Sequence, residues 1–229
     1  MTTSGPIEDR VWPEKLLARA LEDDGETPRL HGFDIQTDLA RHYSFAETLL
    51  IALTGDAQDE ATGKAFEVAM NFASATSVAE APAHVATLAR ICGARTSAIL
   101  AVAATTLSEQ ARTLCDELEP AIPRLHIGSL NGMAPSLTAR NERERNGVAR
   151  LRVALGDFVK RVPSLGYDLR LDVAIVAVLI ACGLRKREQI EAAYCIARLG
   201  ATYVEALATP PGDHRSYPLD LPNFVYEPS

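Results

Sequence analysis

The most informative stretch of the chain spans residues 29–55 and reads RLHGFDIQTDLARHYSFAETLLIALTG. Ser44 and Glu47 have the spacing of a capping box, in which each side chain satisfies a free amide at the start of a helix. Gly55 suits the C-cap of the same helix. Large apolar residues recur at three- and four-residue steps: Leu39, Tyr43, Phe45, Leu49, Leu50 and Leu53. The pattern predicts an amphipathic helix that begins at Ser44 and packs one face into a core.

The composition favours helices throughout. A chain of 229 residues with 47% hydrophobic content can bury a sizeable core, and its length fits one large domain or one domain with a small appendage. Abundant alanine and an aromatic content of only 6% favour close-packed helices over a β-sandwich, because alanine is the best helix former. The formal net charge of −7 argues against a nucleic-acid-binding surface, which needs clustered Lys and Arg.

The cysteines and the apolar runs indicate a cytoplasmic protein. The four cysteines form no C-x-x-C pair, so we expect reduced core residues and no metal site. The N-terminus has no apolar signal core, and the longest apolar run, 173–182, is about half the length of a membrane span. We therefore expect neither secretion nor membrane insertion.

Helical patterns alternate with short breaks along the rest of the chain. The expected helices cover residues 59–73, 82–91, 96–119, 148–162, 172–182 and 188–207. Residues 99–104 and 173–181 are uniformly apolar, so we expect these two helices to be buried on most sides. Covering them requires more surface than one such chain offers, which predicts a dimer.

The breaks suggest how the chain is organised. Turn-forming residues and a charged run at 140–145 mark residues 120–163 as a divergent loop or lid. The predicted organisation is an irregular segment over 1–28, a helical domain over 29–208 and an extended, proline-rich tail over 209–229.

Five arginines lie in or just after the charged run: Arg140, Arg143, Arg145, Arg150 and Arg152. A pair of arginines can hold a di- or tricarboxylate through bidentate contacts. Glutamates and asparagines interleave with these arginines, however, and that mixture favours a solvated charged helix.

The opening stretch resembles the start of the citrate synthase superfamily, whose members join or split carbon–carbon bonds next to an acyl-CoA thioester. The family pattern runs R-G-Y-x-I, then S-F-x-E, then a leucine-rich helix that closes on glycine, and residues 32–35, 44–47 and 49–55 follow it in order. Later segments resemble the citryl-CoA lyase branch: 81–94, 171–183, 197–200 and 223–226. The resemblance implies an all-α fold like the large helical domain of citrate synthase. It also implies that the small domain is largely reduced or missing, because the chain is shorter than active members.

Chemistry in this family requires one carboxylate, which moves a proton at the carbon next to the thioester, and two histidines, which stabilise or protonate oxygens. Asp172 lies where the family's carboxylate is expected, so the resemblance implies that it is catalytic. Its place before an apolar helix fits an N-cap equally well, and this is the structural alternative.

The two family histidines have no counterpart at their expected positions. Residues 107–112 read LSEQAR where G-P-L-H-G-G is expected, and residues 76–78 read TSV in place of D-H-G. His126 lies in a glycine-containing segment and is the candidate for a displaced catalytic histidine. The remaining histidines are expected to be structural or on the surface: His31, His42, His84 and His214.

Two functional hypotheses follow from the resemblance. The first is a catalytically degenerate protein that acts as a partner or regulatory subunit and binds an acyl-CoA or a carboxylate. The second is a divergent citryl-CoA lyase or citrate synthase-type enzyme, in which Asp172 remains and His126 or an arginine has taken over the lost electrostatic role. A coenzyme A thioester is the implied substrate or ligand. The implied partner is a second copy of the chain or a full-length paralogue, and the first hypothesis leads because losing one oxyanion donor alone costs about 100- to 1,000-fold in rate.

Overall fold

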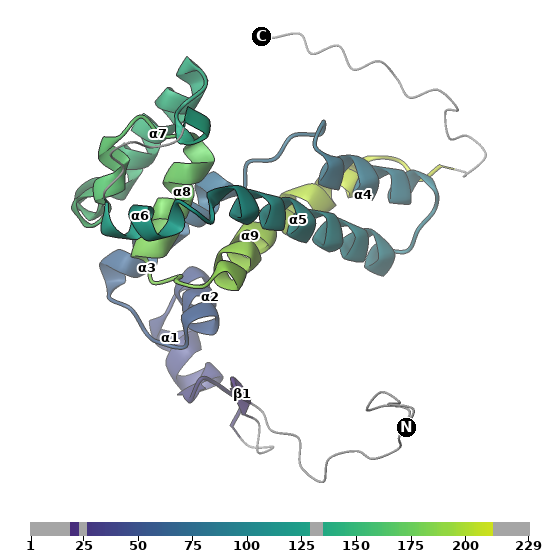
Figure 1. Cartoon of the computed structure of the whole chain (residues 1–229). Helices are drawn as coiled ribbons and strands as arrows, with labels where there is room; N and C mark the ends of the chain where they lie inside the picture. The colour runs from purple at the N-terminus through teal and green to yellow at the C-terminus, as the bar shows by residue number, and fades with distance from the viewer. Residues whose placement is uncertain (1–18, 23–26, 129–134, 213–229) are drawn as a thin grey trace, which may run out of the picture. The chain divides into compact units, whose positions relative to one another are not determined.

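The computed structural model describes residues 19–22, 27–128 and 135–212, and helices make up most of this part of the chain (Figure 1). The all-α prediction is confirmed, with a small three-stranded sheet beside the helices. The chain divides into two compact units between Ala57 and Gln58, so a unit boundary falls inside the single domain expected over 29–208. Most of the segments 1–28 and 209–229, with His214, lie outside the described residues.

The N-terminal unit contains the sheet. Its strands are β1 (Leu21–Glu22), β2 (Arg29–Leu30) and β3 (Phe33–Asp34), antiparallel in the order β1-β2-β3. His31 and Gly32 join β2 to β3 with φ angles of 51° and 85°, the left-handed values that tight hairpins require. The segment 1–28 was expected to be irregular, but its residues 21 and 22 form strand β1. Strands of two residues are too short to show an alternating pattern.

Helix α2 (Phe45–Thr54) follows a π-helical turn (Ile35–Leu39) and α1 (Ala40–His42). The capping box forms as predicted: Ser44 Oγ accepts from the Glu47 amide at 3.2 Å, and Glu47 Oε2 accepts from the Ser44 amide at 2.7 Å. Leu50 is buried, whereas the Phe45 side chain is 81% exposed. The pattern places Phe45 on the inner face, and the structure corrects this: it is the first helical residue, where periodicity alone does not fix burial.

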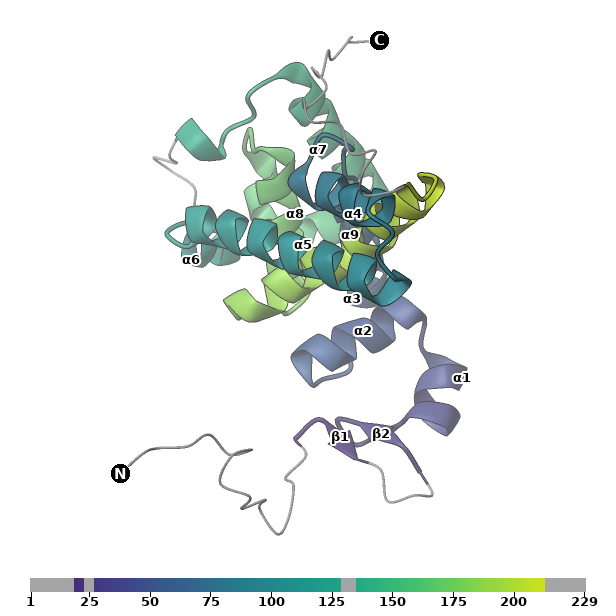
Figure 2. The ribbon, with the colours of Figure 1, turned by 90° about the vertical axis from the view of Figure 1, so that its right-hand side faces the viewer.

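The C-terminal unit consists of helices in two groups (Figures 1 and 2). Its α-helices are α3 (Glu60–Ala73), α4 (Ala81–Ile91), α5 (Thr96–Leu118), α6 (Ile122–Ile127), α7 (Glu142–Leu155), α8 (Leu171–Ala181) and α9 (Arg187–Ala208). The long helices α5 and α9 pack along each other and α4 packs against both. Helix α8 contacts α3, α6 and α7, and α3 also contacts α9. Helix α8 is therefore surrounded by other helices of the unit.

The two uniformly apolar helices differ in burial. Every residue from 173 to 180 in α8 is buried, as the sequence predicts. Helix α5 instead buries one face, with Ile99, Ala103 and Leu107 at four-residue steps, while Leu100 is 39% exposed. The expectation that 99–104 is buried on most sides is therefore wrong. Alanine fills half of that run, and alanine is accommodated on either face of a helix.

The interval 120–163, predicted as a loop or lid, is largely helical in its described residues. It holds α6, α7 and three 3₁₀ segments (Pro135–Leu137, Gly156–Arg161 and the start of Pro163–Gly166). Helix α7 starts at Glu142, earlier than the expected 148, because Asn141 Oδ1 accepts from the Glu144 amide at 2.9 Å and caps the helix. The five arginines in or just after the charged run, Arg140 to Arg152, are all exposed, as expected for a solvated charged helix.

The cysteines are all free, and they differ in environment. Cys115 and Cys182 are buried, and burial raises the pKa of these thiols to about 11 and about 12. Cys92 is exposed, which corrects the expectation of a core position. Within the described part of the chain, no helix combines the length and the apolar character needed to cross a membrane.

Candidate functional site

A cavity of about 170 Å³ lies at the first turn of α8 in the C-terminal unit. Its walls come from the start of α4, the middle of α5, the first turn of α8 and the middle of α9. Its lining residues are Glu80, Leu107, Gln110, Ala111, Leu114, Asp172, Tyr194 and Arg198. Asp172, the carboxylate expected from the sequence, therefore lines a cavity with four other polar side chains.

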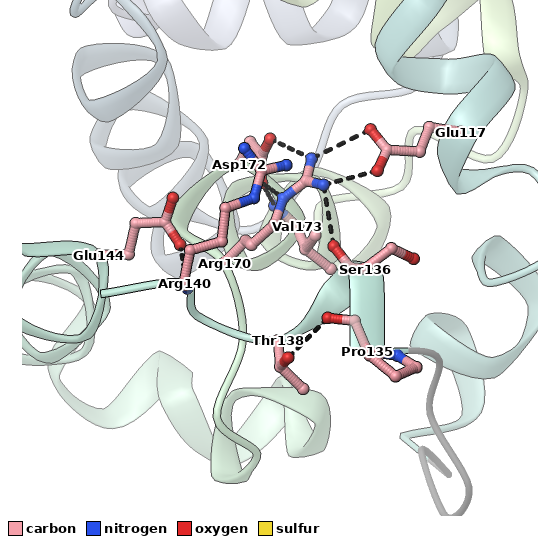
Figure 3. A network of polar contacts seen from close by, with 9 residues as sticks. All are labelled: Glu117, Pro135, Ser136, Thr138, Arg140, Glu144, Arg170, Asp172 and Val173. Atoms are coloured by element: carbon pink, nitrogen blue, oxygen red, sulfur yellow. Dashed lines mark hydrogen bonds and ion pairs between the residues drawn. The ribbon is translucent and has the colours of Figure 1, made fainter. Parts of the chain in front are cut away.

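Asp172 is bound from two sides (Figure 3). Its Oδ1 accepts from the Val173 amide at 2.7 Å and from Arg170 Nε at 3.0 Å, and its Oδ2 accepts from Arg170 Nη2 at 2.5 Å. The N-cap of α8 is Arg170, so the expectation that Asp172 is the N-cap is wrong: Asp172 lies in the first turn, two residues later. Asp172 still satisfies one free amide of the helix, because it sits in the first turn. Its side chain is 37% exposed and reaches the cavity.

Arg170 organises the start of α8. Its side chain is only 4% exposed, and it bonds both Glu117 oxygens at 2.6 and 3.2 Å and the Ser136 carbonyl at 2.9 Å (Figure 3). With its two bonds to Asp172, all five guanidinium donors have acceptors. The hydrogen bond to Asp172, followed by the one to Glu117, raises the pKa of Arg170. Arg170 thus ties the end of α5 and residue 136 to the first turn of α8.

A second polar cluster also lines the cavity. Arg198 Nη1 donates to Glu80 Oε2 at 3.0 Å and to Gln110 Oε1 at 2.9 Å, and Gln110 Nε2 donates to the same Glu80 oxygen at 2.6 Å. Arg198 Nε donates to the Ala73 carbonyl at 3.0 Å. The guanidinium carbon lies 6.0 Å from the centroid of the Tyr194 ring, within the range of a cation–π contact. The Arg198 side chain is therefore held in place while remaining 21% exposed.

Tyr194 connects the two clusters. Its hydroxyl donates to the Asp172 carbonyl at 3.0 Å, so α9 is bonded to the first turn of α8. The side chain is buried, and burial raises the pKa of the phenol well above its ordinary value. Tyr194 is thus a fixed, protonated donor to the main chain.

Of the described residues that line this cavity, none is a histidine. His126 lies in α6, and its side chain is outside the described part of the structure. His31 contacts the Ala52 carbonyl at 3.3 Å inside the N-terminal unit, and His84 lies on α4. The structure thus brings Asp172 to a site without joining a histidine to it among the described side chains. In the same described ranges, no group of three or more His, Cys, Asp or Glu side chains is placed to hold a metal ion.

Sequence reasoning missed most of the polar residues of this site. Those are Glu80, Gln110, Glu117, Arg170, Tyr194 and Arg198. The residues of the second cluster are far apart in the chain, since Glu80 and Arg198 are separated by 118 positions. One local signal was present: Arg170 and Asp172 are two residues apart at the start of a wholly apolar helix, where charged side chains have few other partners.

By sequence, neither a family model nor a characterised protein matches the chain. By structure, it is similar to citryl-CoA lyase from Hydrogenobacter thermophilus, with a TM-score of 0.63 and 16% identity over 94% of this chain and 97% of that chain. It is also similar to ATP citrate lyase from Methanosaeta concilii in complex with (3S)-citryl-CoA, with a TM-score of 0.56, 15% identity and coverage of 95% of this chain and 43% of that chain. A third similar structure is ATP citrate lyase from Methanothrix soehngenii in complex with citrate and coenzyme A. Its TM-score is 0.55 and its identity is 14%, over 95% of this chain and 43% of that chain.

These coverages bear on the length of the chain. The match spans 94% of this chain and 97% of the citryl-CoA lyase chain. A small domain that is reduced in this chain is therefore no difference between these two proteins. The chain spans less than half of each ATP citrate lyase. At identities of 14–16%, the likeness concerns the fold, and this chain has a citryl-CoA lyase-like fold.

Proposed function

We propose that this chain is a catalytically degenerate, citryl-CoA lyase-like protein that binds a small carboxylate, free or carried on a coenzyme A thioester, and acts as a partner or regulatory subunit. The observation that supports this proposal most strongly is internal pairing. Asp172 is bound by Arg170, and Glu80 is bound by Arg198 and Gln110. The charged groups at the cavity thus hold one another.

Pairing makes Asp172 a poor general base. A carboxylate has about four lone-pair positions, and three of those of Asp172 are used by Arg170 and the Val173 amide. A general base must turn a free lone pair towards the proton that it removes. Among the described side chains, none that lines the cavity is a histidine, so no described imidazole is placed to stabilise a developing enolate oxygen there.

Arg198 is suited to bind a ligand carboxylate. The guanidinium lines the cavity, and its Nη2 has no hydrogen-bond partner among the described residues. Arginine binds carboxylates through paired N–H donors. A ligand carboxylate would share Arg198 with Glu80, so we expect modest affinity. The structural neighbours support this ligand class, since the ATP citrate lyases bind citryl-CoA or citrate with coenzyme A.

The partner role is proposed as a homodimer or as a complex with a full-length paralogue. Apolar side chains on two adjacent helices support an interface: Leu100 on α5 and Ile196, Val204 and Leu207 on α9 are 38–63% exposed. Sedimentation of the purified chain at micromolar concentration tests the homodimer, and co-expression with a paralogue tests the mixed complex. A chain that remains monomeric under both conditions contradicts the partner role.

The alternative is a divergent active enzyme of the citryl-CoA lyase or citrate synthase type. One observation favours it: the chain matches nearly the full length of a citryl-CoA lyase, and Asp172 reaches the cavity. In this alternative Asp172 exchanges the proton, and His126 or Arg198 stabilises the oxygen.

Calorimetry tests whether Arg198 binds the ligand carboxylate. Citrate and citryl-CoA binding are measured by calorimetry for the wild type, Arg198→Gln and the control Arg143→Gln, an exposed arginine on α7. We expect Arg198→Gln to weaken citrate binding about tenfold and Arg143→Gln to leave it unchanged. Equal citrate affinity in all three proteins would remove Arg198 from the ligand site.

A further inference from the structure

A second cavity of about 250 Å³ lies in the C-terminal unit, at the other end of α8. Its lining residues are Gln58, Leu125, Arg161, Val162, Ala177, Ile180, Ala181, Gly183 and Arg185. Asp172 and Ala181 are nine residues apart on one helix, so about 14 Å of helix separates the two cavities. They share no lining residue.

The charge of this second cavity is positive. Among the described residues, Arg161 and Arg185 line it and no carboxylate does, although the chain as a whole has a formal net charge of −7. The nearest acidic partner is Asp59, whose Oδ2 accepts from Arg161 Nη1 at 2.7 Å. Counting that carboxylate, the group retains one positive charge. Both arginines are exposed, so their guanidinium groups are accessible to a bound anion, which would balance the remaining charge.

Arg161 is fixed from one side. Its Nη1 bonds Asp59 and the Thr62 hydroxyl at 2.7 and 3.2 Å, and its guanidinium carbon lies 5.3 Å from the centroid of the Phe158 ring. Hydrogen bonds from Thr62 and from Arg161 lower the pKa of Asp59 to about 2, so this carboxylate stays ionised at neutral pH. Nε and Nη2 of Arg161 have no partner among the described residues and remain as donors. A held guanidinium with two open donors costs less side-chain entropy on binding.

Arg185 supplies the second cation. Only its backbone amide is bonded, to Gln189 Oε1 at 2.9 Å, and its guanidinium has no hydrogen bond or ion pair with the described residues. The end of α8 does not oppose an anion strongly, because its last carbonyls are occupied. The carbonyls of Val178, Leu179 and Ile180 accept from Cys182, Leu184 and Gly183, with Gly183 at a φ of 103°.

Apolar side chains line the cavity but are almost fully covered. Leu125, Val162, Ala177 and Ile180 are each less than 5% exposed. The surface open to a ligand therefore comes mainly from Arg161, Arg185 and Gln58, which suits a small, charged ligand. We infer that this cavity is a second binding site, which takes a small oxyanion whose phosphate or carboxylate group bridges Arg161 and Arg185.

Titration with three probes tests the site and separates its two possible head groups. Inorganic phosphate, butyl phosphate and butyrate are titrated into the full chain, with binding followed by calorimetry and by amide chemical shifts. We expect at least one of the three probes to bind saturably, because the open donors of Arg161 and Arg185 can pair with its oxygens. The tighter of butyl phosphate and butyrate identifies the head group. The shifted amides should include Ala181 and Gly183.

Matched arginine variants decide whether the binding belongs to this cavity. Arg185→Gln should weaken the tighter probe about tenfold, whereas Arg143→Gln and Arg198→Gln should leave its affinity within about twofold. Arg185 and Arg143 are both exposed, so neither variant should disturb folding. Absence of saturable binding, equal loss in Arg185→Gln and Arg143→Gln, or shifts centred on Asp172 and Arg198 would each overturn the inference.

Discussion

Arg170 is the residue on which the site depends most. It is almost fully buried, and its five donors join Glu117, Asp172 and the Ser136 carbonyl. The charge pattern of the sequence could place Asp172 at the start of a helix, but it could not show that Glu117, 53 positions away from Arg170, completes the group. Contacts at such separations depend on how helices pack, and packing is not encoded in any single stretch.

Removing Arg170 should destabilise the fold. Arg170→Gln leaves two carboxylates next to each other without their cation, and breaking a buried pair costs about 3–5 kcal/mol. Because Glu117 and Asp172 are 41% and 37% exposed, we expect a smaller loss of about 2–3 kcal/mol in the free energy of unfolding, measured with urea. The control Arg112→Gln removes an exposed pairing on α5 and should change it by less than about 1 kcal/mol. Equal effects of the two variants would contradict the role of Arg170.

Asp59 gives a pH-dependent prediction at the same scale. Its pKa of about 2 in the folded chain lies below the ordinary value of 3.8. The ionised form of Asp59 therefore stabilises the fold fully above about pH 4. This contribution is lost as the pH falls from about 4 to about 2, between the unfolded and the folded pKa. We expect the stability difference between the wild type and Asp59→Asn to shrink between about pH 5 and about pH 3, measured by urea unfolding. A difference that stays constant over this range would contradict the assigned ion pair with Arg161.

At the scale of elements, the caps explain which helices the sequence predicts well. Helix α2 was predictable because Ser44, Glu47 and Gly55 mark both of its ends, and α3 because Asp59 caps its first turn. The start of α7 was missed because the charged run at 140–145 was interpreted as a loop, although Asn141 carries the capping oxygen. The strands of two residues gave no periodic signal at all.

The capping box of α2 should contribute measurably to stability. Ser44→Ala removes the oxygen that accepts from the Glu47 amide, and such a loss costs about 1 kcal/mol. Ser44→Thr keeps the oxygen and should retain most of the stability. Amide hydrogen exchange in α2 reports the change locally. If exchange in α2 is as slow in Ser44→Ala as in the wild type, the cap does not limit the opening of this helix.

For the whole molecule, the resemblance found in the sequence and the structural match agree on the fold. The segments 29–55 and 171–183 carry the sequence resemblance, and the fold is like that of citryl-CoA lyase even at 16% identity. The same agreement does not extend to activity, because activity depends on a few side chains. In this chain Asp172 is tied to Arg170 and Glu80 to Arg198, a pattern that appears only when α4, α5, α8 and α9 are assembled.

Turnover by the purified chain separates a degenerate protein from an active one. Citryl-CoA cleavage, and condensation of acetyl-CoA with oxaloacetate, are followed in a coupled assay for the wild type, Asp172→Asn and His126→Ala. The pairing of Asp172 with Arg170 leads us to expect no turnover in any of the three, with citrate binding retained by the wild type. Turnover by the wild type that is lost in Asp172→Asn would contradict catalytic degeneracy and establish a divergent enzyme.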